Sequence, residues 1–181
     1  MENCSTPLLQ RPQVSSTITT RPPNSSPVVF FCLRGHSCLF AVTMSDSGSL
    51  TADEVIRLLD LEAHPEGGYY RETFRDSTRT GERSASTAIY FLLKQGQISR
   101  WHRIDAVEVW HWYRGAPLRL QIRNAEGPIE TVLLGNNLLK SEQPQAVVPA
   151  QAWQMAETTG AWTLVGCTVA PGFEFAGFQL A

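Results

Sequence analysis

The stretch SRWHRIDAVEVWHWYRG, residues 99–115, holds two of the chain's four histidines and three of its five tryptophans. Side chains alternate between the two faces of an extended strand, so Glu108, Trp110 and Trp112 are expected on one face. His111 falls on the opposite face. A carboxylate among aromatic rings needs a partner, because burying it unpaired costs on the order of several kcal/mol. We therefore expect Glu108 to be paired.

His102 precedes Glu108 by six residues and is its nearest candidate partner. The alternative is that Glu108 lies at the rim of the fold and forms a salt bridge with Arg103 or Arg119, as surface acids on strands commonly do. The aromatic neighbours of Glu108 favour the pairing with His102.

Short segments with strand periodicity make up most of the chain from residue 87 onward. Turn residues such as Gln95-Gly96 and Thr159-Gly160 separate them. The predicted strands cover residues 87–94, 97–104, 106–113, 117–123, 129–134, 145–148, 152–157, 162–169 and 175–180. Short strands at even spacing are typical of a β-sandwich or barrel, so we predict an all-β jelly roll that encloses a cavity.

One short helix is predicted before the strands. Thr51 and Glu54 have the spacing of a capping box and precede apolar residues at helical spacing, so the helix is expected over residues 52–61. Pro65 prevents its continuation. His64 is expected to be a turn residue or a helix-end cap, and the alternative is a ligand that reaches into a pocket.

A further strand is predicted over residues 69–75, with Tyr70, Glu72 and Phe74 on one face. Arg71 lies on the other face. Both Arg71 and Glu72 are candidate ligand-binding residues, and the sequence leaves open which of them faces the cavity. The same question applies to Tyr90.

Residues 1–43 differ in composition from the rest of the chain. They are rich in Ser, Thr and Pro, with three arginines and a single acid. We expect a disordered tail, either a targeting segment or the product of a start placed too early, followed by one domain over residues 44–181.

The composition narrows the function classes. A formal net charge of −2 does not favour nucleic-acid binding, and no apolar run approaches the roughly 18 residues that span a bilayer. The four cysteines lack CxxC spacing, so neither a disulfide framework nor a zinc ribbon is predicted. We expect a cytoplasmic protein with no membrane partner, in which Cys167 is a small buried side chain.

The spacing from His102 to Glu108 and then to Gly115 resembles the first motif of the cupins, and residues 149–154, PAQAWQ, stand where the second motif would fall. The segments HPEGGYYRET, STAIYFLL and LVGCTVAPGFEF are similar to the cupin 5 branch, a domain of unknown function numbered 985, over residues 50–181. This resemblance implies a jelly-roll barrel, usually a homodimer, related in shape to the sugar epimerases of rhamnose biosynthesis. It implies no established reaction.

The chain departs from the metal-binding cupins at two positions. Ile104 replaces the second histidine of the first motif, and Gln154 replaces the histidine of the second. A divalent metal would therefore have only His102, Glu108 and Gln154 as ligands. That set suits zinc and iron poorly, although nickel or manganese could be retained with water ligands.

Three hypotheses follow. The first is a metal-free epimerase or isomerase with His102 as general base, Glu108 or Asp105 orienting its imidazole, and Tyr90 returning the proton. The second is a non-catalytic binding protein for a small metabolite, with polar anchors and an aromatic cage made by Trp110, Trp112, Tyr90 and Arg71. The third, ranked last because of Ile104 and Gln154, is a metal-dependent cupin enzyme.

Overall fold

The computed structural model describes residues 50–76 and 82–181. The predicted tail over residues 1–43 lies outside the described residues. Within the described part of the chain, no helix is long and apolar enough to cross a membrane.

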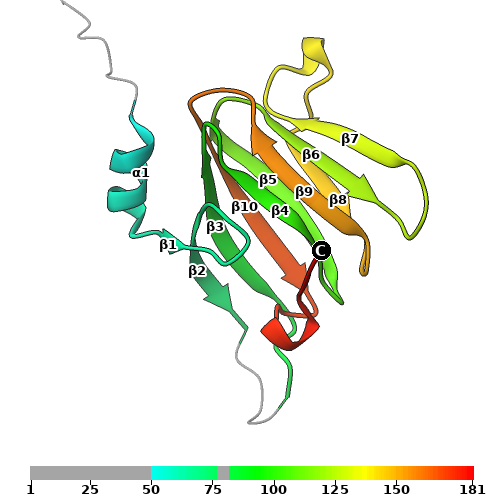
Figure 1. Ribbon diagram of the computed structural model, residues 1–181. Coiled ribbons are helices and arrows are strands. Elements are labelled where there is room, and N and C mark those ends of the chain that lie inside the picture. The colour runs from blue at the N-terminus through cyan, green and yellow to red at the C-terminus, as the bar shows by residue number, and fades with distance from the viewer. Residues whose placement is uncertain (1–49, 77–81) are drawn as a thin grey trace, which may run out of the picture. The chain divides into compact units, whose positions relative to one another are not determined.

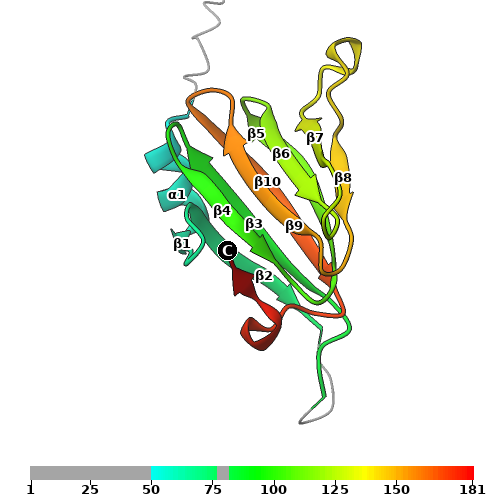
Figure 2. The same ribbon diagram turned by 45° about the vertical axis from the view of Figure 1, so that its right-hand side comes forward.

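Two antiparallel sheets face each other across a shared interior (Figure 1). The first sheet has the order β1 (Glu62–Ala63), β2 (Tyr69–Arg75), β3 (Thr87–Lys94), β10 (Trp162–Ala170), β5 (Val107–Gly115) and β8 (Gln145–Val148). The second has the order β11 (Gln179–Leu180), β4 (Ile98–Arg103), β9 (Trp153–Thr158), β6 (Leu118–Arg123) and β7 (Ile129–Leu134). The turned view shows the long strands of both sheets running side by side (Figure 2). The prediction of an all-β jelly roll with one short helix is confirmed.

The helix α1 (Ala52–Leu59) begins with the predicted capping box and ends two residues earlier than predicted. The Thr51 hydroxyl accepts a hydrogen bond from the Glu54 amide at 3.3 Å, and the Glu54 carboxylate accepts one from the Thr51 amide at 2.8 Å. The helix ends at Asp60, which adopts the left-handed conformation with φ of 53°. Its buried Val55 packs against Leu92 and Trp162, so α1 covers the outer face of the first sheet.

The strand predicted over residues 175–180 is wrong in its first half. Residues Phe175–Gly177 form a short 3-10 helix, η2, and only Gln179–Leu180 form a strand. A second 3-10 helix, η1, covers Leu138–Lys140. A 3-10 turn brings residues three apart to the same side, which a strand would not do. The rings of Phe175 and Phe178 consequently lie 6.2 Å apart, in one cluster with Phe173.

A β-bulge in β4 decides what this strand presents to the interior. Ser99 pairs with Ala156 and His102 pairs with Gln154, so between these pairs two residues of β4 oppose one of β9. Because of the extra residue, Ser99 and His102 are both buried, although strict alternation would put them on opposite faces.

A second bulge lies in β2, where Glu72 pairs with Ile89 and Phe74 with Ala88. The irregularity turns Arg75 to the same face as Glu72, and Phe74 becomes 52% exposed. The predicted grouping of Phe74 with Glu72 is therefore wrong, because alternation fails at the bulge.

Candidate functional site

A cavity of about 450 Å³ lies between the sheets, at the end where η2 is found. Apolar side chains form much of its wall: Ile89, Phe91, Ile104, Trp110, Val169, Phe173, Phe175 and Phe178. Carboxyl, imidazole and guanidinium groups also line it: Glu62, His64, Glu66, Glu72, Arg75, His102, Glu108 and Glu174. A cavity of this size, with an apolar wall and a few polar groups, is typical of a small-molecule site.

A buried polar contact in the cavity wall joins His102 and Glu66. The Nε2 atom of His102 lies 3.3 Å from Oε2 of Glu66, and the two residues are only 3% and 6% exposed. Ser99 donates a hydrogen bond to the other carboxyl oxygen of Glu66 at 2.8 Å. His102 Nδ1 lies 2.8 Å from the carbonyl oxygen of Arg100, which can only accept, so Nδ1 carries the hydrogen. The uncharged ring of His102 therefore presents a lone pair at Nε2 to Glu66.

Burial changes the proton affinity of both groups in the direction that favours the uncharged forms. Desolvation raises the pKa of Glu66 to about 8, although the Ser99 hydroxyl and Arg100 oppose this shift. Burial also lowers the pKa of His102, against the opposing effects of Glu108 and the Arg100 carbonyl. At neutral pH these shifts favour a carboxylic acid at Glu66 beside a neutral imidazole at His102.

His64 lies beside this pair, at a turn and also in the cavity wall, where the alternative of a residue that reaches into a pocket would place it. Its Nδ1 accepts a hydrogen bond from the Glu66 amide at 3.3 Å, and its ring contacts Tyr70 edge-on at 4.6 Å. Burial, and next the neighbouring His102, lower the pKa of His64 to about 4, so this ring is uncharged as well. The available signal was the HPEGG segment, in which a histidine and a glutamate stand two residues apart.

Glu108 is buried in the cavity wall, and the side chain hydrogen-bonded to it is Gln154 and not the expected His102. Trp110 Nε1 can only donate, so the Gln154 oxygen at 3.0 Å must face it, and the amide nitrogen then faces Glu108 at 2.5 Å. Burial raises the pKa of Glu108, although His102 and the Gln154 amide favour its ionised form. The thiol of Cys167 is also hydrogen-bonded to Glu108, and its burial raises the pKa of the thiol well above the usual range.

The alternative in which Glu108 forms a surface salt bridge is wrong. Arg103 donates to the side chain of Gln179 at 2.8 Å, and Arg119 forms its ion pair with Glu157. Both arginines lie outside the cavity lining.

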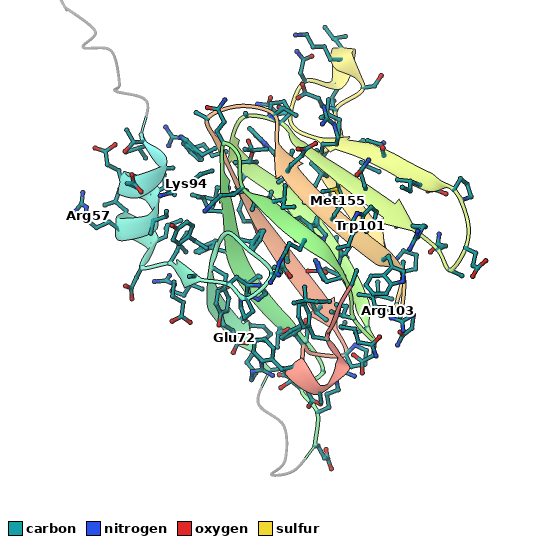
Figure 3. All side chains as sticks on the ribbon, in the orientation of Figure 1. Arg57, Glu72, Lys94, Trp101, Arg103 and Met155 are labelled. Carbon is teal, nitrogen blue, oxygen red and sulfur yellow. The ribbon has the colours of Figure 1, made fainter. Side chains whose placement is uncertain are left out.

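Four of the predicted site residues reach the cavity: His102, Glu108, Trp110 and Glu72. Figure 3 shows Glu72 on β2, near the end of the sheets where η2 lies. Glu72 holds Arg75 through two hydrogen bonds of 2.9 and 2.7 Å. Arg75 also donates to the carbonyl oxygen of Phe173 at 3.2 Å, which links β2 to the segment before η2.

The other predicted residues lie elsewhere. Arg71 and Tyr90 are on the outer face of the first sheet, where the guanidinium carbon of Arg71 lies 5.9 Å from the centre of the Tyr90 ring. Trp112 packs against the core, and its indole donates to the Ala116 carbonyl at 3.0 Å. Asp105 pairs with Arg83 at 2.8 Å. The aromatic cage expected from these residues does not form, and neither Tyr90 nor Asp105 reaches His102.

The metal site expected from the resemblance does not fit these residues. Ile104 offers a buried hydrocarbon where a histidine would stand, and Gln154 turns its amide hydrogens, not its oxygen, towards Glu108. Among residues 50–76 and 82–181, no group of three or more His, Cys, Asp or Glu side chains could hold a metal ion. We therefore derive no chemistry through a metal.

Comparisons with known proteins agree with this architecture. A protein from Shewanella oneidensis of known crystal structure is 38% identical, with a TM-score of 0.71 over 74% of this chain and 85% of that one. A hypothetical protein from Leishmania major is 30% identical, with a TM-score of 0.68 over 73% of this chain and 88% of that one. Oxalate decarboxylase from Bacillus subtilis shares the fold at 16% identity, with a TM-score of 0.53, over 67% of this chain and 30% of its own.

No curated protein matches the chain. Residues 53–181, however, match the family described as "Cupin superfamily (DUF985)". That range covers α1 except its first residue, both sheets and every residue that lines the cavity. The chain therefore belongs to the DUF985 family of the cupin superfamily.

Proposed function

We propose that the cavity is the active site of an enzyme that transfers a proton on a small molecule, in the manner of an isomerase or epimerase. The observation that carries this proposal is the buried contact of 3.3 Å between His102 and Glu66 at the wall of the cavity. An imidazole and a carboxyl group with shifted pKa values are the usual participants in acid–base catalysis.

A proton shared by Glu66 and His102 gives the pair two interchangeable states. Its transfer from Glu66 to His102 converts the acid and neutral imidazole into a carboxylate and an imidazolium. If a bound molecule takes a proton from one member or delivers one to it, the shared proton can shift to offset the change in charge. Such a pair can accept a proton at one stage of a reaction and return it at another.

The surroundings of the pair support this role. Glu108, held by Gln154, places a second carboxyl group whose charge interacts with His102. Phe91, Trp110 and Val169 reduce the polarity of the wall, which strengthens electrostatic interactions inside the cavity.

Exchange of substrate hydrogen for solvent deuterium tests the proposal. The purified protein is incubated in deuterium oxide with dihydroxyacetone, glyceraldehyde, aminoacetone and a panel of aldoses and ketoses. Proton NMR then follows the loss of signal from the carbon beside the carbonyl group. We expect accelerated exchange with at least one compound, and a decrease of about a hundredfold in Glu66→Gln and in His102→Gln.

His111→Gln is the matched control, because His111 lies on the opposite face of β5, where its Nε2 is 3.4 Å from the Thr168 hydroxyl. Its exchange rate should equal that of the unmodified protein. Melting temperatures of all variants separate lost chemistry from lost folding. No exchange with the unmodified protein, or full exchange in a folded Glu66→Gln protein, would contradict the proposal.

A second candidate is non-catalytic binding of a small metabolite. The aromatic side chains of Tyr70, Phe173, Phe175 and Phe178 in the cavity wall favour it, since rings hold ligands without chemical turnover. Ligand-induced stabilisation without hydrogen exchange, retained in Glu66→Gln, would select this alternative.

A further inference from the structure

The charged groups around the cavity are unevenly balanced. Five glutamates line it, against one arginine and two histidines. His64 is uncharged because its pKa is lowered to about 4, and burial lowers the pKa of His102 as well. Even with Glu66 protonated, acids therefore outnumber cations among the described lining residues.

The cationic side chains near the mouth are already engaged with carboxylates. Arg75 is bound through two of its nitrogens to Glu72, at 2.9 and 2.7 Å. Arg83, just outside the lining, is bound in the same way to Asp105, at 2.9 and 2.8 Å. An incoming anion would have to displace one of these carboxylates.

Two exposed glutamates of the lining, Glu62 and Glu174, do not belong to these two ion pairs. Glu62 lies beside Tyr70, where its hydrogen bond adds to the effect of burial in raising the pKa of the Tyr70 hydroxyl. Glu174 directly precedes η2, and its charge interacts with Arg75 and Arg83.

Aromatic rings line the same cavity as these acids. Phe175 is 57% exposed in the lining, with Phe173 at 5.0 Å and Phe178 at 6.2 Å between ring centres. Ring faces attract cations through their quadrupole, and exposed rings next to carboxylates are the usual construction of an ammonium-binding site.

We infer that the cavity selects small molecules that carry a protonated amine, and that it rejects carboxylates of the same size. The cation would interact with Glu62, Glu174 and the ring of Phe175, while the rest of the molecule extends towards His102 and Glu66. This inference rests on the proposed function only in taking the same cavity as the binding site.

Three probes with the same ring and different charge test this inference: benzylamine, benzyl alcohol and benzoate. Isothermal titration calorimetry at pH 7 and low salt compares their affinities. We expect benzylamine to bind about five- to twentyfold more tightly than benzyl alcohol, because each exposed carboxylate contributes about two- to fivefold. Benzoate should bind more weakly than the alcohol.

Two variants test which groups set the preference for the amine over the carboxylate. In the double variant Glu62→Gln with Glu174→Gln, benzylamine and benzyl alcohol should bind within about twofold of each other. In Glu72→Gln, Arg75 loses its bound carboxylate, and benzoate should gain affinity. Glu130→Gln, an exposed change on β7 away from the cavity, is the control and should alter none of the three affinities.

Benzoate binding as tightly as benzylamine would overturn the inference, as would no binding of benzylamine at millimolar concentration. Deuterium exchange by the unmodified protein separates this result from the proposed function. A preference for amines without deuterium exchange would support this inference and contradict the proposed enzyme. Deuterium exchange without a preference for amines would support the enzyme and contradict this inference.

Discussion

One part of the space between the two sheets is filled with apolar side chains, and the other part holds the cavity. Leu118, Leu120 and Leu134 are completely buried in the filled part. In the hollow part Glu66 and His102 are buried side by side. Phe91, Trp110 and Cys167 belong to both, since they are core residues and also line the cavity.

This comparison indicates how the fold accommodates a cluster of buried ionisable groups. The filled part supplies the burial that stabilises the sheets, so the hollow part can contain groups that are costly to desolvate. The largest losses of stability are therefore expected from changes in the filled part.

Truncating a side chain should cost more in the filled part than at the cavity. For Leu120→Ala we expect a loss of about 3 kcal/mol in the free energy of unfolding, because the change leaves a void among packed neighbours. For Ile104→Ala we expect about 1.5 kcal/mol, since the space joins an existing cavity. Chemical denaturation of both variants measures the difference. Equal losses in the two variants would contradict the view that the filled part contributes more to stability than the cavity wall.

Gln154 lies where the filled part and the cavity meet. Its side-chain amide is hydrogen-bonded to Trp110 and to Glu108. In Gln154→Leu, the indole of Trp110 loses its acceptor and Glu108 loses its donor, so we expect a loss of about 2 kcal/mol. Gln121→Leu, a half-buried position on the neighbouring strand β6, should cost under about 0.5 kcal/mol. A neutral Gln154→Leu variant would show that this network contributes nothing to stability.

The pH dependence of stability should reveal the buried Glu66. Its pKa rises from 4.5 to about 8 on folding, so the folded state holds the extra proton and stability falls as pH rises through this range. The lowered pKa of His64 has the opposite effect, but only below its unfolded value of 6.5. Between pH 6.5 and 8 we therefore expect Glu66 to reduce stability by about 1 to 2 kcal/mol.

Glu66→Gln should remove that part of the decline, which denaturation at pH 6.5 and pH 8 would detect. Glu130→Gln, on the exposed strand β7, serves as the control. An identical decline in the unmodified protein and in Glu66→Gln would mean that Glu66 is ionised in the folded state.

The smallest effects are expected on the outer face of the first sheet. Tyr90→Phe should change the free energy of unfolding by less than about 0.5 kcal/mol and leave deuterium exchange unaffected, because the hydroxyl lies away from the cavity. A loss of exchange in a stable Tyr90→Phe protein would restore the role first expected for this tyrosine.

Much of the fold could be predicted from local patterns. The capping box at Thr51 and Glu54 and the strands over residues 87–94, 129–134 and 145–148 agree with the structure. Alternation put Glu108 and Trp110 on one face of their strand, and the aromatic residues on that face indicated that it is the inner one. The loss of metal ligands at Ile104 and Gln154 was also visible without coordinates.

The candidate site was predicted only in part. Glu66 was missed because its partner His102 is 36 residues away, and the HPEGG segment reads locally as a turn. His64 was assigned to a turn for the same reason. Tyr90 and Arg71 were assigned to the cavity although alternation cannot say which face of a strand is the inner one.

The sequence by itself determined the short strands, their turns and the identity of the groups available for chemistry, because alternation and turn preferences act over a few neighbouring residues. Only the tertiary structure decided the bulges at Ser99–His102 and at Glu72–Phe74, and with them the inward direction of His102 and Arg75. It also decided the protonation of Glu66. Register between strands and exclusion of water both depend on contacts between distant parts of the chain, and no local pattern records them.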